Sequence, residues 1–150
     1  MPRRIIALPL LLAAAPAGFT PGLWRITSAP AGATFDGRPL TDLPYTPPVA
    51  PAEPVCMTAA QARDAATWLA ANHMPQGCTA TTRSIAGGRI AIAGTCPPQA
   101  PGLGRGTVRL AGTWSPDRYA LRFATTNPSE NGVMGFTGTV EAKRLGACPG

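Results

Sequence analysis

The sequence is poor in the residues that carry most protein chemistry. Its 150 residues include one histidine, and only 13% are charged and 6% aromatic. The cysteines form no CxxC pair, so neither a zinc site nor thioredoxin-like chemistry is expected. Lys143 is the only lysine among 13 basic residues, and no basic run typical of nucleic-acid binding occurs. We therefore expect no metal, no cofactor and no nucleic-acid partner.

Long hydrophobic runs are also scarce, and the longest lies at the start of the chain. Residues 5–15 are apolar, follow the basic pair Arg3 and Arg4, and lead to small residues at Ala15 and Ala17. This is the pattern of a secretory signal peptide, and the run is about half of the ~20 residues that a transmembrane helix needs. We predict a bacterial protein with a signal peptide over residues 1–17 and no membrane span. One β-rich domain follows over residues 18–150, periplasmic or secreted.

Four cysteines indicate a disulfide framework. A chain sent to an oxidising compartment forms disulfides by default, and an even number of cysteines leaves none unpaired. We therefore predict two disulfides, one between Cys78 and Cys96 and one between Cys56 and Cys148. A Cys56–Cys78 bridge around the predicted helix is the alternative, and the spacing leaves it open.

The preferred pairing follows from a predicted hairpin. Residues 79–85 and 89–95 flank a short glycine-containing loop, the pattern of two antiparallel strands. If the strands close around a three-residue loop, Ile85 faces Arg89. In that register the two cysteines that bound the hairpin also face each other.

Proline and glycine, 18 and 17 residues, exclude long helices. One short helix is expected. Thr58 and Gln61 form a capping box, which begins a helix that ends near Asn72 or His73, before Pro75. The face that this helix can bury is narrow and mostly alanine, so the helix should lie close against a sheet.

Alternation of polar and apolar residues predicts the strands. A first strand is expected over residues 22–28 and is stopped by residues 29–32, whereas the Pro-rich residues 43–54 should be an extended surface connector or, alternatively, a docking segment for an aromatic groove. A five-strand antiparallel meander should follow, with strands at 79–85, 89–95, 106–114, 118–125 and around 136–142. The predicted fold is mainly β with one helix: a curved antiparallel sheet, a meander or partial barrel, with a short helix packed against it and two disulfides.

An ordered set of short motifs resembles the small exported bacterial proteins grouped as domain of unknown function 3617. The motifs are Gly22-Leu23-Trp24, Cys56-Met57-Thr58, Gly77-Cys78 and the closing run from Arg144 to Cys148. The resemblance implies an exported domain with strands and one helix, and it brings no established activity or site residues. The Pro-rich stretch departs from the strand-like approach to the first cysteine that is usual in this family.

No constellation of residues predicts catalysis. His73 falls at the carboxy end of the predicted helix, where the helix dipole favours a charged imidazole that needs no catalytic role. The serines occur in no GxSxG setting, and the cysteines are expected to be oxidised. The seven carboxylates are scattered along the chain. We therefore expect a protein that is not an enzyme.

Binding is the function class that the pattern favours, and two hypotheses stand. Trp24, Tyr119, Phe123 and Phe136 should share the concave face of the sheet, where they either fill the core or hold an apolar or amphiphilic small molecule. The alternative function is a protein–protein module, such as an inhibitor of an exported protease or lysozyme, that uses loops on a disulfide-held scaffold. The partner is accordingly an apolar ligand or an envelope protein.

The polar face of the sheet offers a second candidate site. Arg109 and Arg122 fall on neighbouring strands, where they either attract an anionic group or splay apart in solvent. Parity places Leu110, Tyr119, Leu121 and Phe123 together on the opposite face. If Phe123 faces Phe136 on the last strand, the outer face pairs Arg118 with Glu141.

Overall fold

The computed structural model describes residues 18–41 and 54–150 of the chain. The predicted signal peptide, and residues 43–53 of the predicted Pro-rich segment, lie outside the described residues. The elements are β1 (Gly22–Phe35), β2 (Arg38–Pro39), β3 (Val55–Met57), α1 (Ala59–Arg63), α2 (Ala65–His73), β4 (Thr79–Ala86), β5 (Arg89–Cys96), β6 (Gly106–Ser115), β7 (Arg118–Ser129) and β8 (Gly132–Gly146).

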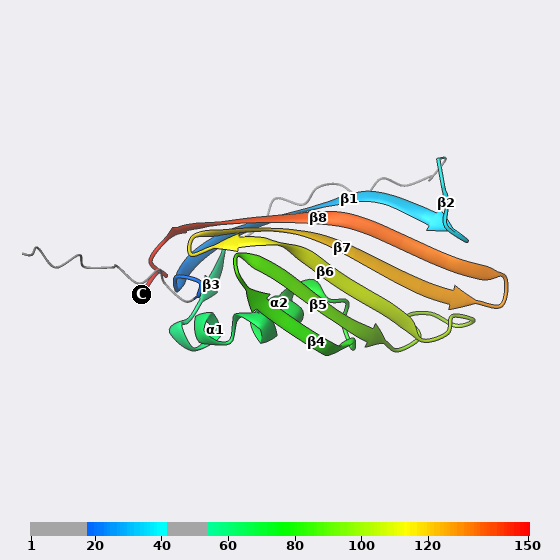
Figure 1. Cartoon of the computed structure of the whole chain (residues 1–150), viewed down its shortest axis with the longest axis horizontal. Coiled ribbons are helices and arrows are strands. Elements are labelled where there is room, and N and C mark those ends of the chain that lie inside the picture. The colour runs from blue at the N-terminus through cyan, green and yellow to red at the C-terminus, as the bar shows by residue number, and fades with distance from the viewer. Residues whose placement is uncertain (1–17, 42–53) are drawn as a thin grey trace, which may run out of the picture.

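An antiparallel sheet in the order β2-β1-β8-β7-β6-β5-β4 makes up most of the protein, and β3 pairs with the start of β1. Strands β4 to β8 form the predicted five-strand meander, and β8 returns beside β1. The sheet is curved and unclosed, with the two short helices against one face (Figure 1). The predicted fold class is confirmed. Within the described ranges, no helix is both long and apolar enough to cross a membrane.

Local capping defines the helical segment. The Thr58 side chain accepts from the Gln61 amide while the Gln61 side chain accepts from the Thr58 amide, so the predicted capping box is confirmed. Asp64 then interrupts the helix with φ −115° and ψ 55°, and its carboxylate caps α2 by accepting from the Thr67 amide. The helix predicted as continuous is therefore two short helices, which end at His73 as expected.

The first strand is longer than predicted. Pro30 was expected to end it, but β1 continues to Phe35 alongside β8. The register shifts between Pro30 and Gly32, which leaves Ala31 as a bulge. Pro30 itself stays in the ladder opposite Gly138, and a position beside a bulge is one at which a sheet tolerates proline without ending the strand.

Both predicted disulfides are present: Cys78–Cys96 and Cys56–Cys148. The register of the β4–β5 hairpin, whose ends the Cys78–Cys96 disulfide joins, differs from the expectation. Gly87 and Gly88 form a two-residue turn with φ of 57° and 72°, so Ile85 faces Ile90 instead of Arg89. An irregularity between Ala80 and Thr82 shifts the register by one residue. That shift brings the two cysteines together.

The helices cover only part of one face of the sheet and leave the rest of that face open. We call the sheet face that carries Tyr119, Leu121 and Phe123 the inner face, and the opposite face the outer face. The core lies between the inner face and α2; its buried side chains include Phe19, Trp24, Met57, Trp68, Leu69, Ile90, Ile92, Val108, Leu110, Tyr119, Leu121 and Val140. Strands β1, β7 and β8 continue beyond this core toward the β7–β8 turn (Figure 1).

The last strand pairs differently from the expectation. Phe123 faces Gly138 rather than Phe136, and Arg118 faces Lys143 rather than Glu141. A Cβ on Gly138 would collide with the Phe123 ring, so the glycine leaves the space that the ring occupies. The faces were predicted correctly, because a shift of two residues changes the partner of a residue but not the side to which it points.

Candidate functional site

Two of the four aromatic residues predicted on the concave face lie in the core. Trp24 is fully buried, and its indole Nε1 donates to the Thr20 carbonyl at 3.2 Å. The Phe19 ring packs edge-on against Trp24, with the ring centroids 5.5 Å apart, and it also contacts Tyr119. These rings close the end of the inner face at which β1 begins and β8 ends. A ligand could reach them only if the core opened.

Tyr119 is also tied to the helix. Its hydroxyl and Nε2 of His73 share a hydrogen bond of 2.8 Å. Burial lowers the pKa of His73 to about 4 and raises the pKa of Tyr119, because each charged form would lose its hydration. His73 is therefore neutral near pH 7. The expectation of a charged imidazole at the helix end was wrong: the ring packs inward, where desolvation outweighs the helix dipole.

The other two predicted residues lie on the open half of the inner face. Phe123 is half-buried over Gly138, and Phe136 keeps 43% of its surface exposed. Phe136 faces Ala33 on β1 and Thr125 on β7, and Phe35 faces Met134 one pair farther along. Pairing thus joins apolar side chains from three neighbouring strands into one patch. We call Phe35, Phe123, Met134 and Phe136 the open apolar patch.

The predicted arginines lie on the outer face. Arg109 faces Ala124 and Arg122 faces Ala111, so the two guanidinium groups are diagonal neighbours across β6 and β7. Both side chains are exposed. Their separation is therefore that of diagonal residues, about 7–8 Å between Cα atoms, rather than that of a direct pair.

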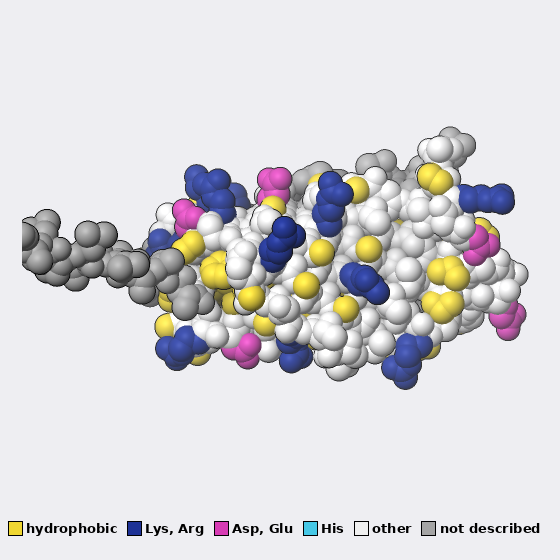
Figure 2. Space-filling model, in the orientation of Figure 1, with side chains coloured by type: hydrophobic (Ala, Val, Ile, Leu, Met, Phe, Trp, Pro, Cys, Tyr) yellow, Lys and Arg dark blue, Asp and Glu magenta, His cyan; other side chains and the backbone are white. Residues whose placement is uncertain are grey.

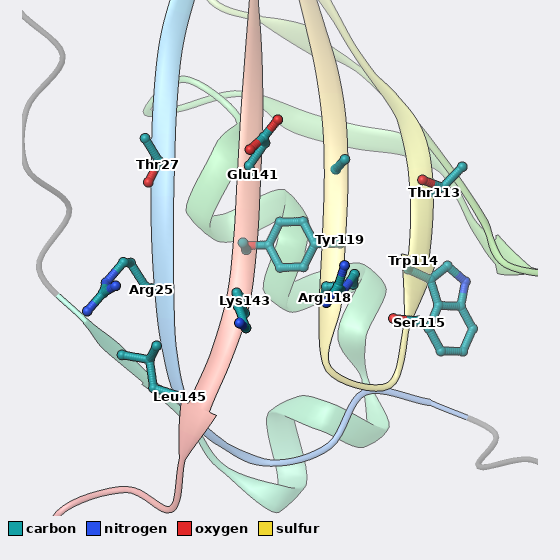
Figure 3. Close-up of a pocket in the computed structure, with 12 residues that line it drawn as sticks. Arg25, Thr27, Thr113, Trp114, Ser115, Arg118, Tyr119, Glu141, Lys143 and Leu145 are labelled. Carbon is teal, nitrogen blue, oxygen red and sulfur yellow. The ribbon is translucent and has the colours of Figure 1, made fainter.

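A row of three cations was not predicted from the sequence. Arg25 on β1 faces Lys143 on β8, and Lys143 faces Arg118 on β7. Figure 3 shows these side chains at one level on three adjacent strands, with Glu141 one row along. They line a shallow depression of about 610 Å³ that also includes Thr27 and Leu145. We call Arg25, Lys143 and Arg118 the cation row. The row depends on the β1–β8 and β7–β8 registers together, and the register expected from the sequence placed Glu141, not Lys143, opposite Arg118.

The described residues hold neither a free thiol nor a cluster of metal ligands. All four cysteines are in disulfides. In residues 18–41 and 54–150, no group of three or more His, Cys, Asp or Glu side chains is placed to hold a metal ion. The described residues thus present the open apolar patch on the inner face and the cation row on the outer face.

No curated protein and no solved structure matches the chain. A family model does match, that of the "Protein of unknown function (DUF3617)" family, over residues 19–148. The match spans nearly all of the chain that follows the predicted signal peptide and includes all four cysteines. The protein belongs to the DUF3617 family.

Proposed function

We propose that this protein is a non-enzymatic binding protein of the bacterial envelope, periplasmic or secreted, that holds an apolar or amphiphilic small molecule on the open half of its inner face. The exposed ring of Phe136, beside the half-buried Phe123, carries the proposal. The two disulfides are typical of an oxidising compartment and support this location.

The proposal is supported by a difference in burial between the two halves of the inner face. Near α2 the inner face is filled by side chains such as Trp24 and Leu121, which are at most 2% exposed. Beyond the helix the same face continues with large apolar side chains that have incomplete cover. Covering such surface stabilises a complex by roughly 25 cal/mol per Å², so a ligand with an apolar body gains most of its affinity there.

Dye binding tests the proposal. N-phenyl-1-naphthylamine, which fluoresces in apolar surroundings, should bind the wild-type protein, and Phe136→Ala should weaken its affinity about tenfold, as expected for the loss of roughly 1.4 kcal/mol of apolar contact. Leu145→Ala is the matched control, because Leu145 is 41% exposed on the outer face. Equal losses for the two variants, or no dye binding to wild type, would contradict the proposal.

A second candidate function is the protein–protein module, such as an inhibitor of an exported protease or lysozyme. The filled half of the inner face favours it, since a rigid scaffold that presents loops needs no cavity. Native mass spectrometry separates the two candidates: a small molecule that co-purifies with wild type but not with Phe136→Ala supports the first. Inhibition of lysozyme or of a serine protease by the purified protein, with no bound small molecule, supports the second.

A further inference from the structure

We propose that the outer face of the sheet docks on a membrane surface of anionic phospholipids, with the cation row as the centre of the contact. This inference concerns the face opposite to the open apolar patch and does not depend on the function proposed above. It rests on the register of the strands, on the scarcity of acidic partners, and on the spread of cations over the whole face.

The cation row places like charges side by side. Arg25, Lys143 and Arg118 are directly opposed across β1, β8 and β7, and strands lie about 4.8 Å apart. Like charges directly opposite each other destabilise a sheet. An anion between them removes this repulsion, so the row gains from a phosphate group that approaches from solvent.

The described part of the chain does not neutralise the row from within. One carboxylate comes near it: Asp117, 3.9 Å from the Arg118 guanidinium, with both groups exposed. Arg25 and Lys143 have no described carboxylate within 4.0 Å. Glu141 stands one row away, opposite Thr27 and Ala120, and makes no ion pair with the cations in the same depression.

The cationic surface extends beyond the row. On β1 and β5 to β8, strand pairing assigns six cations to the outer face against one carboxylate, Glu141; the cations are Arg25, Arg89, Arg109, Arg118, Arg122 and Lys143. Between them lie small residues such as Ala111, Ala120 and Thr139, which do not hinder approach. Figure 2 shows dark blue side chains spread over the body of the molecule with small yellow ones between them.

This distribution fits a surface better than a single small anion. Six charges carried by five strands are too dispersed to converge on one phosphate, whereas lipid headgroups offer negative charge over a comparable area. Leu145 lines the depression of the cation row and is 41% exposed. Its side chain adds an apolar contact at the level where headgroups meet acyl chains.

Vesicle co-sedimentation tests the proposal with the purified, disulfide-bonded protein. Vesicles of phosphatidylcholine with one quarter phosphatidylglycerol should bind it at 50 mM salt, and binding should weaken strongly at 300 mM salt as charges are screened. Vesicles of phosphatidylcholine alone should not bind it. Each cation near an anionic surface contributes about a fivefold factor, so Arg25→Gln/Arg118→Gln/Lys143→Gln should reduce partitioning on the order of 100-fold.

A charge-matched variant distinguishes binding by the outer face from binding that depends only on the net charge of the protein. Arg38→Gln/Arg63→Gln/Arg83→Gln removes three charges from β2, α1 and β4, where Arg83 faces Ile92 on the side of the core. This control should lose far less binding than the row variant. Glu141→Gln removes the carboxylate beside the row and should strengthen binding about fivefold.

Several outcomes would overturn the proposal. Equal losses for the two triple variants would assign binding to net charge. Absence of vesicle binding together with binding of inorganic phosphate at the cation row would make the row a small-anion site. Phe136→Ala should leave vesicle binding unchanged, so failure of the apolar-ligand proposal and failure of this one are separable.

Discussion

The single histidine makes the stability of this protein depend on pH in a window where few other groups titrate. His73 has an ordinary pKa of 6.5 and a pKa of about 4 in the folded protein, lowered by burial. The unfolded chain therefore binds a proton between these values while the folded protein does not, and stability falls as pH falls from about 6.5 toward 4. The loss should be about 2 kcal/mol between pH 7 and pH 5, an interval above the usual titration range of carboxylates.

Urea unfolding at pH 7 and pH 5, followed by tryptophan fluorescence, measures this loss directly. His73→Gln should remove most of the dependence, because glutamine does not titrate and can still hydrogen-bond to the Tyr119 hydroxyl. Tyr119→Phe removes that hydroxyl and should keep the dependence, since burial is the cause of the shift. Wild-type stability that is equal at the two pH values, or a His73→Gln variant with an undiminished slope, would refute the reasoning.

Three further predictions concern packing, disulfides and processing. Gly138→Ala should destabilise the fold by about 1–3 kcal/mol, because its Cβ meets the Phe123 ring, whereas Gly32→Ala, whose Cβ would find its nearest atom at 3.8 Å, should be almost neutral in the same unfolding assay. Cys78→Ser/Cys96→Ser should lower the free energy of unfolding by about 3 kcal/mol, measured by thermal denaturation, since the bridge closes a loop of 18 residues; an unchanged melting temperature would contradict this. Amino-terminal sequencing of the exported protein should begin at or near Gly18, and material that still begins at Met1 would exclude the predicted signal peptide.

Local sequence patterns were sufficient to predict the structure wherever a short stretch of chain specifies its own geometry. The capping box at Thr58 needs only residues within one helical turn, and it formed as expected. Alternation assigned Leu110, Tyr119 and Leu121 to the buried face, because side chains of a strand point to opposite sides at every residue. A register shift of two residues also keeps each side chain on the same face of the sheet. The predicted faces were therefore correct even where the predicted pairing was wrong.

The cysteine pairing shows how a correct prediction can rest on an incomplete geometry. The three-residue loop assumed for the hairpin placed Cys78 opposite Cys96, but the actual turn has two residues and moves the register by one. The irregularity between Ala80 and Thr82 compensates. A bulge leaves no clear mark on alternation in a strand with small and polar residues, so it was not predicted.

The break in the helix at Asp64 and the burial of Trp68 could not be predicted without the tertiary structure. Asp64 is compatible with a continuous helix, and it became a second cap because two short segments place Ala62, Ala65 and Trp68 against the sheet. Trp68 is 4% exposed, although the predicted buried face was mostly alanine. Contact with Tyr119 and His73 gives the indole its partners.

By itself, the sequence determined the family, the oxidised cysteines, the strand-rich class and the side of the sheet to which the residues of β6, β7 and β8 point, since these depend on motifs and on a period of two. Only the tertiary structure decided the register of β8 against β1 and β7, and with it which residues are neighbours there. The fit of Phe123 over Gly138 accompanies a register that pairs Arg118 with Lys143 instead of Glu141. That difference of two residues turns an expected salt bridge into a row of three cations, because register depends on packing between strands distant in the chain and not on the pattern within any one of them.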